Sequence, residues 1–111
     1  MSTTLTVLNT ATVSDVSLGG DSTSAYVYPV SIGLPSAFDG TLFYIEVKYG
    51  STWRRILETN GATKAFTLYA SGLIPIDIDT IKSIRGRQFR IVCATTQTAD
   101  RTFEVFYEKL D

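Results

Sequence analysis

The sequence Leu34-Pro-Ser-Ala-Phe-Asp-Gly-Thr-Leu-Phe-Tyr-Ile-Glu-Val-Lys-Tyr-Gly-Ser-Thr-Trp-Arg-Arg-Ile-Leu57 decides the fold. One face of the segment 43–49 carries the apolar side chains Phe43, Ile45, Val47 and Tyr49. The opposite face carries Tyr44, Glu46 and Lys48. Because side chains alternate across a strand, this pattern predicts a half-buried β-strand. Gly50-Ser51 supplies a two-residue hairpin turn, and Trp53 opens the return strand.

Further strands are predicted on both sides of this hairpin. Leu5 and Val7 indicate a short strand near the start, and the longer apolar segments are 25–32, 65–69, 89–95 and 101–109. Pro29 lacks an amide donor, which favours an edge position or a bulge. Asn60-Gly61 is a strong turn signal. We expect the last two strands to form a hairpin, because only a short turn separates them.

Residues 71–86 fit neither the helical nor the strand period, so we expect an irregular loop with a short strand there. A helical turn over 79–84 is the alternative within this segment. The whole pattern is seven or eight short strands at roughly 8–12-residue spacing, which predicts an all-β fold, an antiparallel β-sandwich or jelly roll. The expected organisation is a polar N-terminal arm or edge strand over residues 1–24 and a β-sandwich domain over residues 25–111.

Composition argues against several functions. The chain has 111 residues and a net charge of −1, so neither a nucleic-acid partner nor a membrane partner is expected. It contains no histidine, which is the commonest general base and zinc ligand, so we expect no enzyme, no small-molecule substrate and no cofactor. No signal peptide or membrane-spanning segment is recognisable, so synthesis in a cytoplasm is expected.

Two sequence features could indicate a reactive thiol or a calcium site, but their surroundings favour neither. Cys93 is the single cysteine and lies among apolar strand residues, so we expect a buried thiol rather than a reactive one. Asp77 and Asp79 have the spacing that begins some calcium loops, but no further carboxylate follows at loop spacing. We therefore predict no metal site.

Surface arginines and aromatic residues are the candidates for a protein interface. Arg85, Arg87 and Arg90 present planar donors of the kind enriched at interfaces, although a solvated rim that pairs with nearby aspartates is an equal alternative. Outward or unassigned apolar residues on several strands suggest a face covered by another subunit. These further interface candidates are Leu5, Val7, Tyr26, Tyr28, Tyr44 and Phe106.

Several motifs resemble a segment of small structural proteins of tailed bacteriophages. The first part is Leu34-Pro35-Ser36 followed by Gly40-Thr41, a strand with Ile45-Glu46-Val47, and Gly50-Ser51-Thr52-Trp53. The second part is the strand beginning Arg87-x-Phe89-Arg90-Ile91, a Thr/Gln/Ala/Asp turn over 96–101, and a closing strand over 102–107. The similarity covers residues 32–109, and its motifs are structural rather than chemical.

The resemblance implies a β-sandwich that assembles onto a virion. Its expected form is a capsid cement, or decoration, protein that forms a homotrimer on the capsid exterior and binds the major capsid protein. A head–tail joining or tail accessory protein is one alternative. A carbohydrate-binding module that stacks sugars on Tyr26, Tyr44 and Trp53 is another, from a different functional class.

Overall fold

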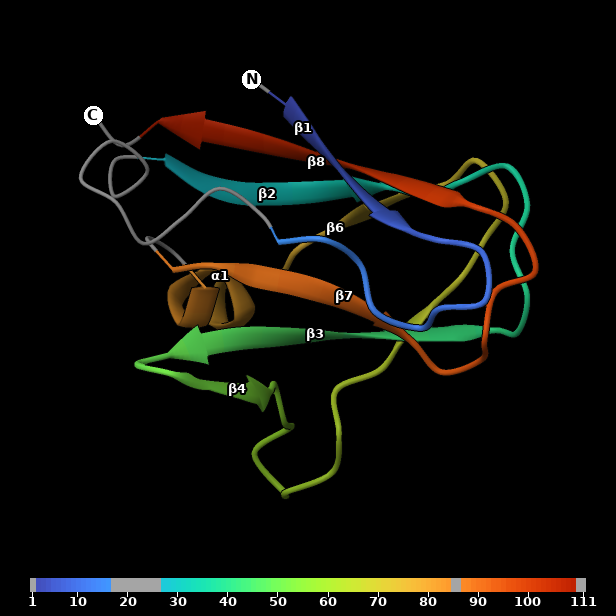
Figure 1. Cartoon of the computed structure of the whole chain (residues 1–111). Coiled ribbons are helices and arrows are strands. Elements are labelled where there is room, and N and C mark those ends of the chain that lie inside the picture. The colour runs from blue at the N-terminus through green and yellow to red at the C-terminus, as the bar shows by residue number, and fades with distance from the viewer. Residues whose placement is uncertain (1, 17–26, 85–86, 110–111) are drawn as a thin grey trace.

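The chain folds into two antiparallel β-sheets. The computed structural model describes residues 2–16, 27–84 and 87–109. Sheet A contains β1 (Ser2–Val7), β8 (Arg101–Lys109), β2 (Val27–Gly33) and β6 (Leu73–Pro75), in that spatial order. Its strands lie above those of the second sheet in Figure 1. The predicted all-β sandwich of about eight strands is confirmed.

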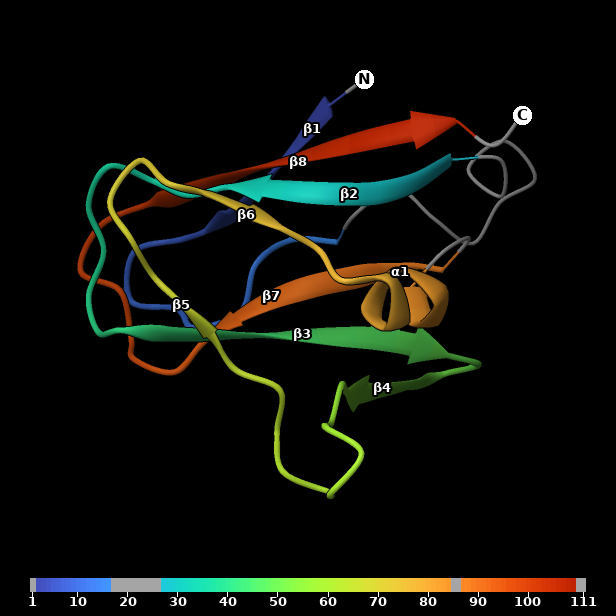
Figure 2. The same ribbon diagram turned by 180° about the vertical axis from the view of Figure 1, so that it is seen from behind.

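Sheet B is built around β3 (Leu42–Tyr49). β7 (Phe89–Cys93) pairs with one side of β3, and β4 (Thr52–Arg55) and β5 (Phe66–Thr67) pair with the other. The free side of β7 is extended by residues 11–14, since Thr12 O accepts from Cys93 N at 2.7 Å and Ser14 N donates to Ile91 O at 2.9 Å. Figure 2 shows β5 next to β3 and β6 next to β2.

The core lies between the inner faces of the sheets. Phe43 of β3 stacks on Phe66 at 5.2 Å between ring centroids and meets Phe103 of β8 at 5.5 Å. The alternating positions that the sequence assigned to the interior are buried on β7 and β8, and on β3 except for Tyr49, which is 40% exposed at the hairpin end. Burial of such large side chains is the main stabilising contribution to the fold.

The prediction that the last two strands form a hairpin is wrong. β7 belongs to sheet B and pairs with β3, whereas β8 belongs to sheet A and lies between β1 and β2. Each strand has one strongly apolar face, for example Ile91 on β7 and Phe103 on β8. Placing the two strands in facing sheets buries both apolar faces in one core, which a flat hairpin would not do.

Two turn and bulge signals were correct. The register of β2 against β8 shifts between Pro29 and Ser31, which is the bulge that proline favours. Gly50 has φ +64° at the turn between β3 and β4, and Tyr49 pairs with Thr52 across it. The positive φ explains why glycine occupies this position.

Residues 71–86 contain more order than the sequence predicted. Besides β6 they form the short helix α1 (Ile78–Ile84), which contacts β2 and accepts a hydrogen bond from Tyr49 at the end of β3. Asp77 caps its start, because its carboxylate accepts from Thr80 N at 3.2 Å and from Thr80 Oγ1 at 2.7 Å. The Asp-x-Asp spacing therefore includes a helix N-cap.

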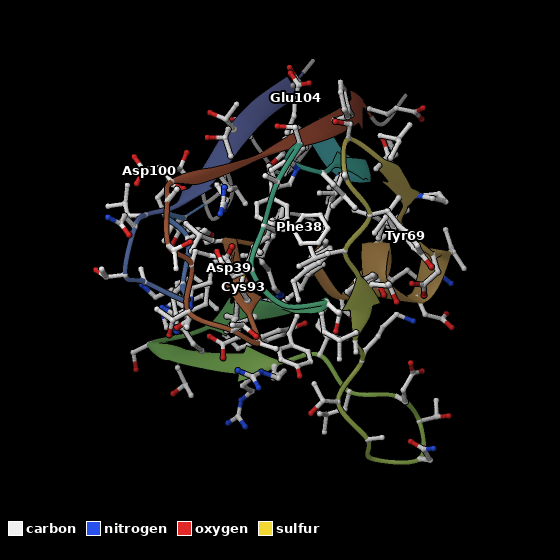
Figure 3. All side chains as sticks on the ribbon, turned by 90° about the vertical axis from the view of Figure 1, so that its right-hand side faces the viewer. Phe38, Asp39, Tyr69, Cys93, Asp100 and Glu104 are labelled. Carbon is white, nitrogen blue, oxygen red and sulfur yellow. The ribbon has the colours of Figure 1, made fainter. Side chains whose placement is uncertain are left out.

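One end of the sandwich is closed by a polar cluster that we call the Gln97 clasp: Asp39, Gln97, Thr98 and Arg101. Gln97 is fully buried, and its amide exchanges hydrogen bonds of 2.8 Å with the backbone N–H and C=O of Asp39. Arg101 Nη2 lies 3.0 Å from Asp39 Oδ1, which also accepts from Thr98 N at 2.9 Å. Figure 3 looks onto this end, with Phe38 and Asp39 on the connection from β2 to β3.

Residues 9–11, which follow β1, are hydrogen-bonded to the connection between β7 and β8 at the end of the sandwich where the Gln97 clasp lies. Gln97 O accepts from Thr10 N at 2.8 Å, and Ala11 O accepts from Gln97 N at 3.1 Å. Asn9 N donates to Asp100 Oδ1 at 2.8 Å, and Asp100 is labelled in Figure 3 on the connection from β7 to β8. The clasp thus fixes three loops that no sheet ladder holds.

Candidate functional site: the outer face of sheet B

The outer face of sheet B, the side turned away from sheet A, gathers charged and aromatic side chains from three strands. On β3 this face carries the polar set predicted from the sequence, because its residues alternate with the buried ones. Glu46 lies opposite Arg55 of β4 on one side and Arg90 of β7 on the other. The register therefore places one carboxylate between two guanidinium groups.

Both arginines bind the Glu46 carboxylate directly. Arg90 contacts Glu46 Oε1 through Nη2 at 2.7 Å and through Nε at 2.9 Å. Arg55 Nη2 donates to Glu46 Oε2 at 3.2 Å. The side chain of Glu46 is 15% exposed, whereas those of Arg55 and Arg90 are 38% and 25% exposed. The carboxylate is thus the covered centre of the network, and the guanidinium groups form its accessible part.

Each of these guanidinium groups also lies over an aromatic ring. Arg55 Cζ is 4.6 Å from the centroid of the Tyr44 ring, and Arg90 Cζ is 4.2 Å from the Trp53 ring. These separations are within the range of cation–π attraction. We call the five residues Tyr44, Glu46, Trp53, Arg55 and Arg90 the arginine face.

The hairpin end of sheet B carries a related contact. Arg87 Cζ lies 3.9 Å from the centroid of the Tyr49 ring, and the Tyr49 hydroxyl donates to Ser83 O of α1 at 2.8 Å. The helix thereby supports the ring on which the arginine stacks. Arg87 is exposed, but Tyr49 shares the face of β3 that carries Phe43, Ile45 and Val47, so this contact lies on the other side of sheet B from the arginine face.

An apolar row borders the arginine face. Tyr44 lies opposite Val92 of β7, and Val13 forms a bridge with Val92 on its far side. Ile56 N donates to Ile45 O at 3.1 Å, and Leu57 follows as an exposed residue beside a pocket that Lys64, Asp77 and Asp79 also line. Val13 is 37% exposed and Leu57 is 53% exposed. The face therefore combines apolar area with stacked cations.

Leu5 and Val7 were predicted as interface residues, and the structure corrects this. They are 1% and 0% exposed and point into the core from β1. β1 is an edge strand of sheet A that pairs with β8, so these side chains belong to the same core as the rest of the sandwich. The alternation of Leu5 and Val7 with threonine already indicated one buried face.

The other candidates divide into placed and undescribed residues. Tyr44 and Arg90 lie on the arginine face, whereas Arg87 stacks on Tyr49 at the hairpin end, on the other side of sheet B. Phe106 lies half-buried on the outer side of sheet A, where its Cε2 is 3.4 Å from the position a Cβ would take at Gly33. Tyr26, Arg85 and the side chain of Tyr28 lie outside the described residues.

The sequence did not identify Glu46 and Arg55 as parts of the site. Both follow from the hairpin signal, because a two-residue turn at Gly50-Ser51 pairs residue 46 with residue 55. The contact with Arg90 could not be found in this way, because it depends on the long-range pairing of β3 with β7. Trp53 was noted only as a candidate for sugar stacking.

The remaining chemical groups are structural. Cys93 is buried, and burial raises the pKa of its thiol to about 11, so it is a neutral thiol. Asp77 pairs with Lys64 at 3.2 Å in addition to capping α1. Within residues 2–16, 27–84 and 87–109 there is no group of three or more potential metal-ligating side chains. No helix in those same ranges has the length and hydropathy needed to cross a membrane.

Comparison of the chain with protein-family models, with curated protein sequences and with solved structures gives no match.

Proposed function

We propose that this protein is a non-enzymatic structural component of a bacteriophage virion, a capsid cement protein that binds the major capsid protein on the outside of the shell. The sequence resemblance over residues 32–109 is the basis for the phage assignment. The arginine face is the observation that supports an interface role. Trp, Tyr and Arg are the residue types that dominate binding energy at protein interfaces.

The physical task of a cement protein suits this surface. It adds contact free energy between neighbouring capsid subunits and so raises the cost of separating them. If its site spans two subunits, it binds the assembled lattice in preference to free subunits. A homotrimer presents three copies of the arginine face to the shell, which multiplies the effective affinity.

The apolar row next to the arginine face gives a direct test. We expect Val13→Asp to abolish co-sedimentation with empty shells of the virus that carries the protein. Leu73→Asp is the matched control, because Leu73 is 63% exposed on β6 of the other sheet. Equal binding by the two variants would contradict an interface on sheet B.

Shell stability and oligomeric state test the rest of the proposal. Particles that lack the protein should disassemble at a lower temperature and a lower chelator concentration than complete particles. Size-exclusion chromatography with light scattering should give three times the mass of a single chain. A monomer that leaves particle stability unchanged would contradict the cement role. Binding only to tails or head–tail connectors would favour the tail accessory alternative.

A carbohydrate-binding role fits the arginine face less well. Sugar stacking needs an accessible ring face. Here the guanidinium group of Arg55 covers one face of the Tyr44 ring, and that of Arg90 covers one face of the Trp53 ring. Binding to a glycan array without affinity for shells would nevertheless identify that function.

A further inference from the structure

Charge is unevenly distributed over the protein. The segments 46–55 and 87–92 contain five of the ten basic residues but only one of the eleven acidic ones, Glu46. Of these basic residues, Lys48, Arg55 and Arg90 lie on the outer face of sheet B, whereas Arg54 and Arg87 alternate to the other side. The rest of the chain therefore carries a strong excess of acidic side chains, although the net charge is only −1. We call the two segments together the basic end of sheet B.

The single carboxylate at this end is already occupied. Glu46 accepts from two nitrogen atoms of Arg90 and one of Arg55. A guanidinium group has five N–H donors, so each arginine keeps donors that Glu46 does not use. Asp15 follows Ser14, whose backbone N–H donates to Ile91 O of β7, and Asp15 Oδ1 accepts from Thr6 N at 2.8 Å. With both carboxylates counted, the three basic side chains of the outer face, Lys48, Arg55 and Arg90, still exceed Glu46 and Asp15 by one positive charge.

Two of these arginines are also held in place before any partner binds. Glu46 fixes one edge of each guanidinium, and Tyr44 and Trp53 support their planes. Ordering a free arginine at an interface costs side-chain entropy, and a pre-ordered one avoids part of that cost. A fixed planar donor group matches the geometry of a carboxylate, which can accept two parallel hydrogen bonds.

We propose that the basic end of sheet B binds an acidic protein surface, in which aspartate and glutamate carboxylates surround an apolar centre. The carboxylates would pair with Arg55 and Arg90, and the apolar centre would cover Tyr44 and Val13. This inference rests on the proposed function in naming the shell as the partner. The chemistry of the partner surface follows from the charges and stacking of this chain.

The same surface fits a nucleic acid less well. A nucleic acid would bring a continuous row of phosphates across Glu46, whose carboxylate lies at the centre of the arginine face. The apolar row through Tyr44 and Val13 has no counterpart in a phosphate backbone. Complementary charge at a protein interface instead sets partner choice and association rate.

The first experiment measures co-sedimentation of the full-length protein with empty shells over a series of salt concentrations. We expect binding to weaken steeply with salt, because screening reduces attraction between accessible charges. The double variant Arg55→Gln and Arg90→Gln should lose at least about tenfold in affinity for the shells. Lys82→Gln on α1 is the matched control for loss of a positive charge and should bind as the unmodified protein does. Urea unfolding of each variant checks that the fold is intact.

The second experiment uses defined probes and does not depend on the shell. Fluorescence anisotropy compares labelled poly-L-glutamate with a duplex DNA of similar length for the unmodified protein and the same variants. We expect poly-L-glutamate to bind more tightly than the DNA, and the arginine variant to lose about tenfold in affinity for it.

The two experiments separate the two proposals. Shell binding that is insensitive to salt and to the arginine variant overturns the acidic-partner inference and leaves the cement role standing. No shell binding counts against the cement role, and the probe experiment then decides the inference alone. Tighter binding to DNA than to poly-L-glutamate, or equal binding by the arginine and lysine variants, overturns it.

Discussion

The Gln97 clasp and the arginine face both contain an arginine–carboxylate pair, Arg101–Asp39 and Arg90–Glu46, at 3.0 Å and 2.7 Å. In the clasp, the side chains satisfy backbone groups of loops that have no sheet partner. On the arginine face, the strands below are already held by their own backbone ladder. The same kind of ion pair therefore stabilises the fold in one place and presents accessible charge in the other.

The largest expected effect comes from removing the buried amide of the clasp. Gln97→Ala should lower the free energy of unfolding by about 3 kcal/mol, because it empties a fully buried site and removes the partners of the part-buried backbone groups of Asp39 and Thr95. Urea unfolding followed by tryptophan fluorescence measures this. Gln88→Ala, at the half-buried residue just before β7, is the matched control and should cost less than about 1 kcal/mol. Equal losses would remove the distinction between the two regions.

Two glycines with positive φ, one in each region, allow the clasp and sheet B to be compared through backbone substitutions. Gly40 at the clasp has φ +81°, and an added Cβ would lie 2.7 Å from the Thr95 Cβ. Gly50 in the β3–β4 turn has φ +64°, with open space around the added atom. We expect Gly40→Ala to cost about 2 to 3 kcal/mol and Gly50→Ala about 1 kcal/mol, since only the first adds a steric clash to the strained φ. Thermal unfolding of both variants measures the order, and a reversed order would contradict the crowding at Gly40.

A pair of arginine substitutions sharpens the comparison further. Arg90→Ala should cost less than about 1 kcal/mol of stability, because its ion pair lies on an accessible sheet face. Arg101→Ala should cost more, since it removes a contact with Asp39 and one with the buried Gln97. Urea unfolding of the two variants in parallel gives the difference. A larger loss for Arg90→Ala would mean that the arginine face is mainly a stabilising element.

The smallest effect is confined to acid conditions. The pKa of Asp39 lies below its ordinary value of 3.8, because Thr98 N–H, the Arg101 guanidinium and the Thr98 hydroxyl all bind the carboxylate. The unfolded chain therefore takes up the proton first as the pH falls. The stabilising contribution is present above pH 3.8 and is lost as the pH falls through the lower folded value.

Asp39→Asn should remove this part of the acid dependence. Urea midpoints measured from pH 5 downwards should fall less steeply for the variant than for the unmodified protein. Asp77 should account for remaining slope, because its pKa is also lowered: burial raises it, but hydrogen bonds from Thr80 and Lys64 outweigh burial. An unchanged slope in the Asp39 variant would show that the clasp does not depend on this charge.

Local signals in the sequence predicted the strands well. The alternation in β3 and the Gly50-Ser51 turn fixed the hairpin, and the buried positions of β8 followed from the same period of two. Helix α1 was only an alternative, because its isoleucines gave no clean helical period and Asp77 was considered as a cation ligand. The sequence signal for this helix was Asp77 as an N-cap residue directly before Ile78.

Long-range pairing was beyond the reach of these signals. Nothing local in the sequence distinguishes a hairpin of β7 with β8 from a crossing between sheets, and the choice depends on burying two apolar faces together. The arginine face was found only in part for the same reason. Arg90 was a candidate, but the strand that carries it had to be placed beside β3 before its contacts with Glu46 and Trp53 became visible.

The pairing of β1 with β8 has a consequence for biosynthesis. Its register joins Ser2 to Phe106 and Val7 to Arg101, so β1 acquires its partner only when almost all of these residues have left the ribosome. Until then Leu5 and Val7 have no completed core to enter. We therefore expect sheet A to close after translation rather than during it, and nascent chains truncated before β8 to be protease-sensitive and to bind chaperones.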